Sequence, residues 1–371
     1  MSTPLPSTRL TGIDALRGLA AISVVFYHYT TRYQQKFGFA EPPGIEFPFG
    51  HLGVNLFFVI SGFVIFMTLE RIRRPEDFVV SRFSRLFPTF WAAVLLTACV
   101  EALSQALGSG LSLPHIAANL LMVHEFLGFP SVDGVYWTLQ VELFFYLWMF
   151  TLWLIGGLQR PYPWLGLWLL LSLAQGGVAG WSLPIPYRLA QLWLLPQIPF
   201  FVLGMAVYLQ HSRGAAERFG PFALGIAALA VIGLSQGSEL LAWAVSFLVL
   251  LQLALRINAR AERLARPVIW LGAVSYPLYL LHQNIGYTVI HFSQQWGANA
   301  LMAGALALLV ALLLAGGVHR LVELPAMEAI RRFYKAKPVA LPLNRWHWLG
   351  LALGLAIGLL GLSFVLPRLF A

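Results

Sequence analysis

The feature that most constrains this chain is a succession of apolar stretches, each about long enough to cross a lipid bilayer. A hydrocarbon core of about 30 Å is spanned by roughly 20 apolar residues in a helix. Only 11% of the 371 residues are charged, against about 25% in a typical soluble domain. We therefore expect an all-α, polytopic membrane helix bundle, with spans near residues 11–30, 51–70, 86–107, 136–157, 163–180, 191–210, 220–236, 239–257, 268–291, 298–320 and 347–366.

Lysine and arginine are distributed unequally between the two sides of these expected spans. Most of the 24 lie in one set of connecting segments, notably 71–85, 256–266 and 331–345. The other set contains only Arg32, Lys36, Arg188 and Arg368. Because cytoplasmic loops are enriched in Lys and Arg, we expect a cytosolic N-terminus and a C-terminus outside. The net charge of +9 then reflects topology, and no motif indicates nucleic acid as a partner.

The first apolar stretch contains charges that lipid disfavours. Its sequence, GIDALRGLAAISVVFYHY, includes Asp14, Arg17 and His28. At 100° per residue Arg17 and His28 share one helix face, and they lie about 16 Å apart along the axis. An ionisable group in mid-membrane costs about 2.5–3.5 kcal/mol, so it usually faces a cavity or a partner. The alternative is that each side chain extends to its nearer layer of headgroups.

Two further spans contain residues suited to acid–base chemistry. Glu142, in WTLQVELFFYL, is an acid inside an expected span, at a depth where it can meet His28. A carboxylate beside an imidazole raises its basicity, which suits removal of a proton from a hydroxyl group. In the ninth span, Ser275, Tyr279 and His282 lie on one stripe. The alternative roles of these residues are structural hydrogen bonds, ion pairing and helix packing.

Small polar residues and a pair of arginines complete the candidate set. Asn55 and Ser61 lie in the second span, GHLGVNLFFVISGFVIF, where helix packing is the alternative role. Arg82 and Arg85, in EDFVVSRFSRLFP, share a face if that segment is helical. Paired guanidinium groups suit phosphate binding, although ordinary cytosolic loop charges give the same pattern. The sequence contains no Walker loop, HExxH, GxSxG or CxxC motif. It also has no cluster of His, Cys, Asp or Glu with metal-ligand spacing, so we expect no metal.

Five segments in order resemble membrane-bound acyltransferase family 3, the multi-span O-acyltransferases of surface glycans. They are RLTGIDALRGLAAISVVFYH, GVNLFFVISGF, SRFSRLFP, WTLQVELFFYL and SYPLYLLH, and VELP closes the tenth span. Together they cover nearly the whole chain. Many members of the family have a second arginine directly before the RxxR step, and here Ser81 stands in that place.

The resemblance implies ten core transmembrane helices, with the apolar run at 347–366 as one C-terminal appendage helix. It thus implies an acyltransferase transmembrane domain at residues 1–335, followed at 336–371 by a cytosolic linker and an additional transmembrane helix. The implied donor is cytosolic acyl-CoA, usually acetyl-CoA, and the implied acceptor is a hydroxyl of an extracytoplasmic or lipid-linked glycan. Membrane lipid and a polysaccharide-assembly machinery are the other expected partners, in a bacterial cytoplasmic (inner) membrane.

Residues and resemblance together predict a polar passage through the bundle. Its inner mouth would bind the CoA phosphates through Arg17, Arg82 and Arg85. At its outer end, His28 would act as the base toward the sugar hydroxyl or carry the acyl group, with Glu142 and His282 beside it. The substrate would be contacted by Asn55, Ser61 and Tyr279.

A proton-coupled exporter of a glycan or small metabolite is the alternative from another class of protein. Intramembrane His and Glu are typical of proton relays in transporters. The sequence shows no inverted repeat or matched pair of broken helices, which many transporters have. Binding or hydrolysis of acyl-CoA by the purified protein would distinguish the enzyme from the transporter.

Overall fold

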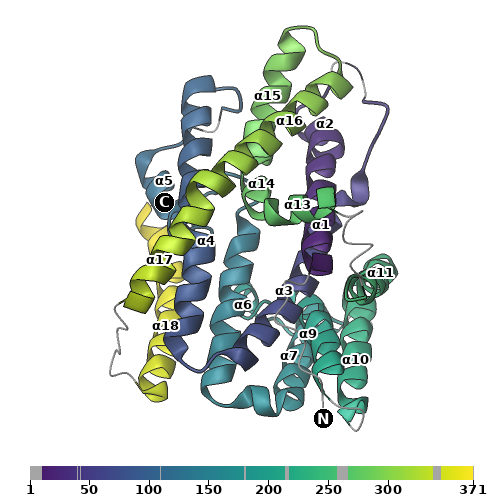
Figure 1. Cartoon of the computed structure of the whole chain (residues 1–371), viewed down its shortest axis with the longest axis vertical. Helices are drawn as coiled ribbons and strands as arrows, with labels where there is room; N and C mark the ends of the chain where they lie inside the picture. Colours follow the sequence, from purple (N-terminus) through teal and green to yellow (C-terminus); the bar gives the residue numbers. More distant parts are fainter. Residues whose placement is uncertain are drawn as a thin grey trace.

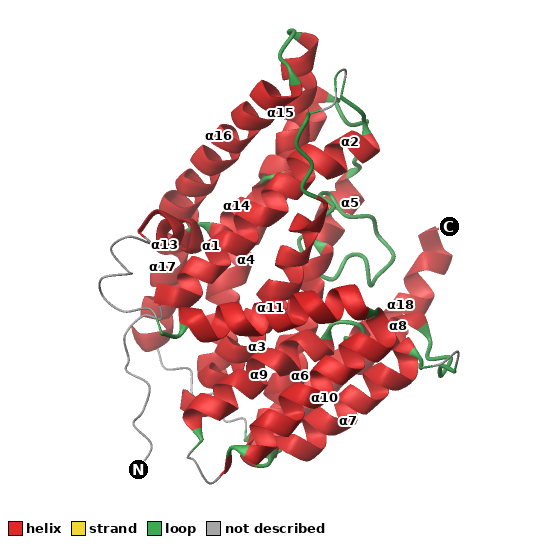
Figure 2. Ribbon diagram, turned by 90° about the vertical axis from the view of Figure 1, so that its right-hand side faces the viewer, coloured by secondary structure: helices red, strands yellow, loops and turns green. Residues whose placement is uncertain are grey.

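The protein is helical throughout the part of the chain that the structure describes. The computed structural model describes residues 11–39, 41, 43–108, 110–178, 181–213, 217–256, 266–336 and 344–370. These residues contain no strand, as Figure 2 shows, so the all-α prediction is confirmed. Parts of the expected basic segments 256–266 and 331–345, namely residues 257–265 and 337–343, lie outside the described residues.

The helices that surround the functional residues come from the first, middle and last parts of the chain. They are α1 (Thr11–Tyr27), the π-helical turn η1 (His28–Arg32), α2 (Tyr33–Lys36), η2 (Pro48–Leu52), α3 (Gly53–Arg71), α4 (Pro75–Ser104), α6 (Trp137–Leu154), α13 (Arg266–Ala273), α14 (Ser275–Leu281), α15 (Gln283–Gln295), α16 (Ala300–Val318), η5 (His319–Glu323) and α17 (Leu324–Ala336). Figure 1 shows α15 and α2 near one end of the long axis and α7 and α10 towards the other.

The remaining helices pack around this group. They are the short α5 (Leu113–Asn119), η3 (Gly157–Gln159), α7 (Pro161–Gly176), α8 (Tyr187–Leu192), α9 (Ile198–Ser212), α10 (Phe219–Gln236), α11 (Ser238–Ala254) and the C-terminal α18 (Arg345–Phe370). Helix α18, the expected appendage, packs against α6 and α8. Helix α5 lies in the segment between the third and fourth expected spans.

Five described helical segments are long and apolar enough to cross a membrane, which makes this an integral membrane protein. They are Pro48–Arg71, Pro75–Ser104, Phe219–Gln236, Ala300–Ala336 and Arg345–Leu366. Ile198–Ser212 and Ser238–Ala254 are apolar but shorter. The five long segments match four of the ten expected core spans and the C-terminal appendage helix. The count of ten stays a prediction, because the helices at the other expected positions are shorter or less apolar.

The ninth expected span is divided into shorter helices. Instead of one helix over 268–291, the chain forms α13, α14 and α15, separated at Val274 and His282. Pro277, the third residue of α14, has no N–H to give to a preceding turn, which favours a break just before it. The break turns the helix direction at His282, where backbone groups become available to partners elsewhere in the bundle.

Helix α4 begins earlier than expected. The segment that contains Arg82 and Arg85 was expected to be a basic loop, but the helix starts at Pro75 in the favourable first position and continues through Pro88 to Ser104. Its 30 residues extend about 45 Å, so α4 is longer than a bilayer core is thick. Arg82 and Arg85 are therefore held on a helix face and not on a loop.

Helices α3 and α9 cross at two glycines. A Cβ atom on Gly62 would lie 2.0 Å from the carbonyl oxygen of Phe201, and one on Gly204 would lie 1.8 Å from that of Val59. The two backbones can approach this closely only because both positions lack a side chain. Ser61 and Phe58, on α3 beside this crossing, are thereby fixed in place.

Candidate functional site

A cavity of about 210 Å³ lies among six helices of the bundle. Helices α1, α3, α4, α6, α14 and α17 each contribute to its wall. The apolar part of the wall is mostly from α3 and includes Phe57 and Phe58. The polar lining residues are Arg17, Ser61, Arg82, Arg85, Thr138, Glu142, Tyr146, Ser275, Tyr276, Tyr279 and Arg331.

Four arginines give this cavity a strongly positive wall. Arg17, Arg82 and Arg85, which the sequence indicated, are joined by Arg331 of α17. The described ion pairs of the structure involve other basic residues, and none of them includes these four guanidinium groups. Like charges gathered in a partly enclosed cavity repel unless an anion neutralises them, and guanidinium groups bind phosphate in a bidentate manner. The cavity is therefore a candidate site for a phosphate-bearing ligand.

Arg82 of this wall has a guanidinium nitrogen that lacks a hydrogen-bond partner within the described part of the chain. One of its terminal nitrogens donates to Ser81 Oγ at 3.0 Å, and its guanidinium lies 5.7 Å from the ring centre of Tyr146. Its Nε atom is buried and has no hydrogen-bond partner among the described residues. A buried guanidinium nitrogen without a partner is costly, so this atom is available to a ligand.

Glu142 is the acid of this arginine-lined cavity. Its Oε1 accepts hydrogen bonds from Ser61, at 3.2 Å, and from the hydroxyl of Tyr146. Its charge acts on Arg17. The expected partnership with His28 is not among the described contacts of either residue; Glu142 lies instead with the arginines and balances part of their charge.

The two candidate histidines form a pair that the sequence could not show. His28 comes from the start of η1 and His282 from the break between α14 and α15. Their rings are 4.8 Å apart, and His282 Nε2 lies 3.1 Å from His28 Nδ1. His282 is fully buried and His28 is 9% exposed. The histidines therefore face each other and not the lipid, although they are 254 residues apart in the chain.

The hydrogen bonds of this pair define its tautomers. His282 Nδ1 lies 2.8 Å from the carbonyl oxygen of Tyr279, and His28 Nδ1 lies 2.9 Å from that of Val24. A carbonyl can only accept, so we assign a proton to both Nδ1 atoms. The one proton on His28 Nδ1 is then shared, in a three-centre hydrogen bond, between the Val24 carbonyl and Nε2 of His282. This assignment leaves Nε2 of His28 as the basic nitrogen of the pair.

Local backbone geometry holds the pair in place. The π-helical turn that starts at His28 widens the helix where its side chain binds the carbonyl one turn earlier. Tyr29 donates to the carbonyl oxygen of His282 at 2.7 Å. Both fully buried oxygens of Asp133 accept backbone N–H groups, from Val135 at 3.1 Å and from Asn284 at 2.9 Å. Sequence reasoning missed Tyr29, Asp133 and Asn284, because their contacts join distant segments.

Tyr279 separates the cavity from the histidine pair. It lines the cavity, its hydroxyl accepts a hydrogen bond from Thr138 at 3.0 Å, and its ring lies 5.7 Å from that of His282. Neither His28 nor His282 belongs to the cavity wall. The expected continuous passage is therefore divided in this conformation: an arginine-lined cavity ends at Tyr279, and the histidines lie directly behind it.

The other side of His28 leads towards the surface. The ring of Tyr27 lies 5.1 Å from that of His28 and 5.2 Å from that of the exposed His51.

Of the two remaining candidate residues, one lines the cavity and the other lies outside it. Ser275 lines the cavity and donates to the carbonyl of Gly272 at 2.8 Å, whereas Asn55 is half-buried on α3 outside the lining. The described residues contain no group of three or more side chains that could hold a metal ion.

A helical membrane bundle with a cationic cavity next to a buried imidazole pair has the groups that an integral-membrane enzyme needs for acid–base chemistry. The chain belongs to acyltransferase family 3: the family model, described as an acyltransferase domain, matches residues 10–320. The protein is thus a membrane acyltransferase. No solved structure matches the chain.

Curated relatives agree with this family. The chain is 29% identical over 270 residues to the exopolysaccharide production protein ExoZ of Rhizobium meliloti (strain 1021), which covers 66% of this chain and 78% of ExoZ. It is 25% identical to the acyltransferase MdmB of Streptomyces mycarofaciens, over 90% of this chain and 94% of MdmB. The peptidoglycan O-acetyltransferase OatA of Listeria monocytogenes is 27% identical over 36% of this chain and 22% of OatA.

Proposed function

We propose that this acyltransferase moves an acyl group, most commonly acetyl, from cytosolic acyl-CoA to a hydroxyl group of an extracytoplasmic or lipid-linked glycan. The observation that carries the proposal is that Tyr279 joins an arginine-lined cavity to a buried histidine pair: it lines the cavity, and its ring lies 5.7 Å from that of His282. A donor with several phosphates suits the first, and deprotonation of a hydroxyl suits the second. The names of ExoZ and OatA support a glycan as the acceptor.

The donor binds at the end of the cavity that is lined by arginines. Arg17, Arg82 and Arg85 bind the phosphates of the CoA, and the narrow pantetheine arm extends along the apolar face of α3. The thioester then reaches the layer formed by Tyr279 and Phe57, whose rings are 5.9 Å apart. Movement of the Tyr279 side chain brings the thioester carbonyl to the histidines. Arginine-rich segments face the cytosol in this scheme, in agreement with the distribution of charges along the chain.

The transfer step uses His28 as the base. Its Nε2 takes the proton of the acceptor hydroxyl as the hydroxyl oxygen attacks the thioester carbonyl. The C–O ester bond forms, the C–S bond breaks, and the proton passes from His28 to the leaving thiolate. His282 accepts the hydrogen bond of His28 Nδ1 and so holds the ring in the required tautomer. In the alternative course, His28 Nε2 itself takes the acyl group first and then gives it to the hydroxyl.

The substitution His28→Ala tests this proposal. Loss of a general base lowers a rate about 10²- to 10⁴-fold, so we expect no detectable acylation of glycans at wild-type levels of folded protein. The measurement is the ester content of surface glycans in cells that express the wild type, His28→Ala or no protein. His291→Ala is the matched control, since His291 lies on the neighbouring α15 and its described side-chain hydrogen bond is with Gln295. Near-normal ester content in the His28 variant would end the proposal.

A further inference from the structure

Helix α17 covers the arginine-lined end of the cavity without packing deeply against it. Its apolar and polar residues segregate strongly, yet none of its residues is buried. Arg331 nevertheless lines the cavity, where Arg82 and Arg85 of α4 act on it electrostatically. A third guanidinium is thus brought towards two others from a separate helix, which is unfavourable unless an anion lies between them.

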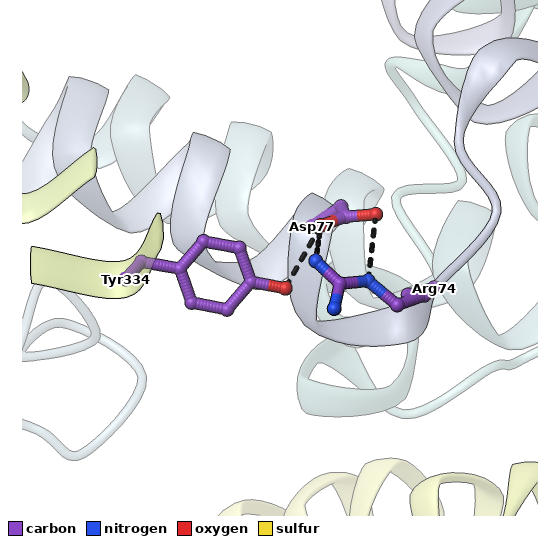
Figure 3. Close-up of polar contacts among 3 residues, drawn as sticks. All are labelled: Arg74, Asp77 and Tyr334. Atoms are coloured by element: carbon purple, nitrogen blue, oxygen red, sulfur yellow. Dashed lines mark hydrogen bonds and ion pairs between the residues drawn. The ribbon is translucent and has the colours of Figure 1, made fainter. Parts of the chain in front are cut away.

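A polar contact fastens the end of α17 to the start of α4. The hydroxyl of Tyr334 donates to Asp77 Oδ1 at 2.8 Å, and Arg74 Nη2 donates to the same oxygen at 3.0 Å (Figure 3). Arg74 also lies 5.4 Å from the ring centre of Tyr334. Tyr334 is one turn beyond Arg331, so this three-residue latch of Arg74, Asp77 and Tyr334 sets the position of the Arg331 guanidinium.

The joint between α16 and α17 favours movement of α17. Helices α16 and α17 form one continuous helical segment, Ala300–Ala336, of 37 residues, which is about 55 Å long and exceeds the thickness of a bilayer core. The π-helical turn η5 lies at the joint, and Pro325 follows as the second residue of α17. Helices bend most readily at such irregularities. Figure 1 shows α17 beyond this joint, beside α4.

We propose that α17 is a clasp that closes the donor site: Arg331 binds a phosphate of the acyl-CoA together with Arg82 and Arg85, and the latch of Arg74, Asp77 and Tyr334 holds the clasp closed. The inference rests on the proposed function, since it assumes a donor with phosphates. It assigns Arg331 to substrate binding and gives Tyr334 and Asp77 positioning roles.

The test compares Arg331→Gln with Arg332→Gln in purified full-length protein. Arg332 is the adjacent residue but is 77% exposed and paired with Glu328, so its substitution is the matched control. A hydrogen bond to a charged group contributes about 1.5–3 kcal/mol, so Arg331→Gln should raise the Kd of CoA and the KM of acetyl-CoA about 10-fold or more. The kcat should change little. Acetyl-pantetheine, which has no phosphates, should be used equally by all three proteins, and Arg331→Lys should restore part of the affinity.

The outcomes separate this inference from the function on which it rests. If wild-type protein neither binds CoA nor transfers its acyl group, the proposed function fails and the clasp fails with it. If the wild type uses acetyl-CoA and Arg331→Gln has the wild-type Kd and KM, the clasp alone is wrong. An equal rise of KM for acetyl-CoA and acetyl-pantetheine also overturns it, because the loss would then be structural.

The latch gives a second, independent measurement. Tyr334→Phe removes only the hydroxyl that binds Asp77, and a single hydrogen bond contributes about 1 kcal/mol. We expect a rise of roughly fivefold in the Kd of CoA, with faster amide hydrogen exchange over residues 324–336. Tyr162→Phe serves as the control. Unchanged exchange and unchanged affinity in Tyr334→Phe would show that α17 is held in place without the latch.

Discussion

The residue whose position differs most from expectation is Glu142. Depth in the membrane and the lack of a local cationic partner suggested that it assists His28. In the folded chain, Ser61 and Tyr146 donate to it, and it is the carboxylate that lines the arginine cavity. Its charge therefore belongs to the arginine-lined cavity, and His282 takes the place beside His28 that Glu142 was expected to occupy.

Substitution of Glu142 by Gln tests this reassignment. The change keeps the shape but removes the negative charge that offsets Arg17, so the protein without ligand should unfold at a lower temperature. The cavity becomes more positive, so CoA should stabilise the variant more than the wild type, by about 1 kcal/mol or more. Thermal unfolding with and without CoA measures both effects, and Glu217→Gln, at an exposed surface pair with Arg213, is the control. If the variant binds CoA as the wild type does but the pH dependence of acyl transfer is shifted, the reassignment is wrong and Glu142 acts together with the histidines.

At the scale of helices, irregularities place the functional groups. The π-helical turn at His28, the break at His282 and the π-helical turn before α17 each interrupt an apolar helix next to a residue of the site. A regular helix would satisfy its own backbone, whereas after the break at His282 the N–H of Asn284 donates to Asp133. The carbonyl oxygen of His282 keeps its helical bond from Gly286 and also accepts from Tyr29. The close crossing of α3 and α9 holds α3 in place, and α3 forms the apolar wall of the cavity that the irregular helices also line.

Gly204→Ala tests that wall. Its new methyl group would lie 1.8 Å from the carbonyl oxygen of Val59, so α3 and α9 must separate. Overpacking of this kind typically costs about 1–3 kcal/mol, and displacement of α3 should also weaken CoA binding. Gly304→Ala on α16 is the control, because its methyl group meets open space and should be neutral or stabilising by up to about 1 kcal/mol. Equal stability of the two variants in unfolding assays would contradict the tight crossing.

At the scale of the whole molecule, the site has two chemically different ends. The arginines of α4 and α17 lie at one end of the cavity, and the other end stops at Tyr279, behind which the histidines lie. Transfer from a cytosolic donor to an outer acceptor requires that these ends open to opposite sides of the membrane. The long helices α4 and α16–α17 extend beyond a bilayer core, so the latch lies near or beyond its boundary.

Cysteine labelling tests this orientation. With Cys99 replaced by serine, Trp296→Cys, in the exposed turn between α15 and α16, should react with a membrane-impermeant maleimide in intact cells. Arg332→Cys on α17 should react only after the membrane is permeabilised, because α17 is expected on the cytosolic side. The opposite pattern of labelling would reverse the topology and contradict a cytosolic donor site.

The sequence by itself determined the properties that depend on composition and local periodicity. The length of the apolar stretches predicted a helical membrane protein, and the spacing of Arg82 and Arg85 predicted a shared face on the condition, met by α4, that their segment is helical. Arg17 and His28 were singled out because lipid penalises ionisable groups. These inferences hold because each concerns a single helix and its solvent.

Only the tertiary structure decided which of these residues meet. The pairing of His28 with His282, the place of Glu142 among the arginines and the arrival of Arg331 from α17 depend on contacts between distant segments. They depend also on where helices break, and a π-helical turn or a break before proline is stabilised by partners elsewhere in the bundle. Helical periodicity fixes the direction of a side chain relative to its own helix, whereas the packing of helices fixes what it faces.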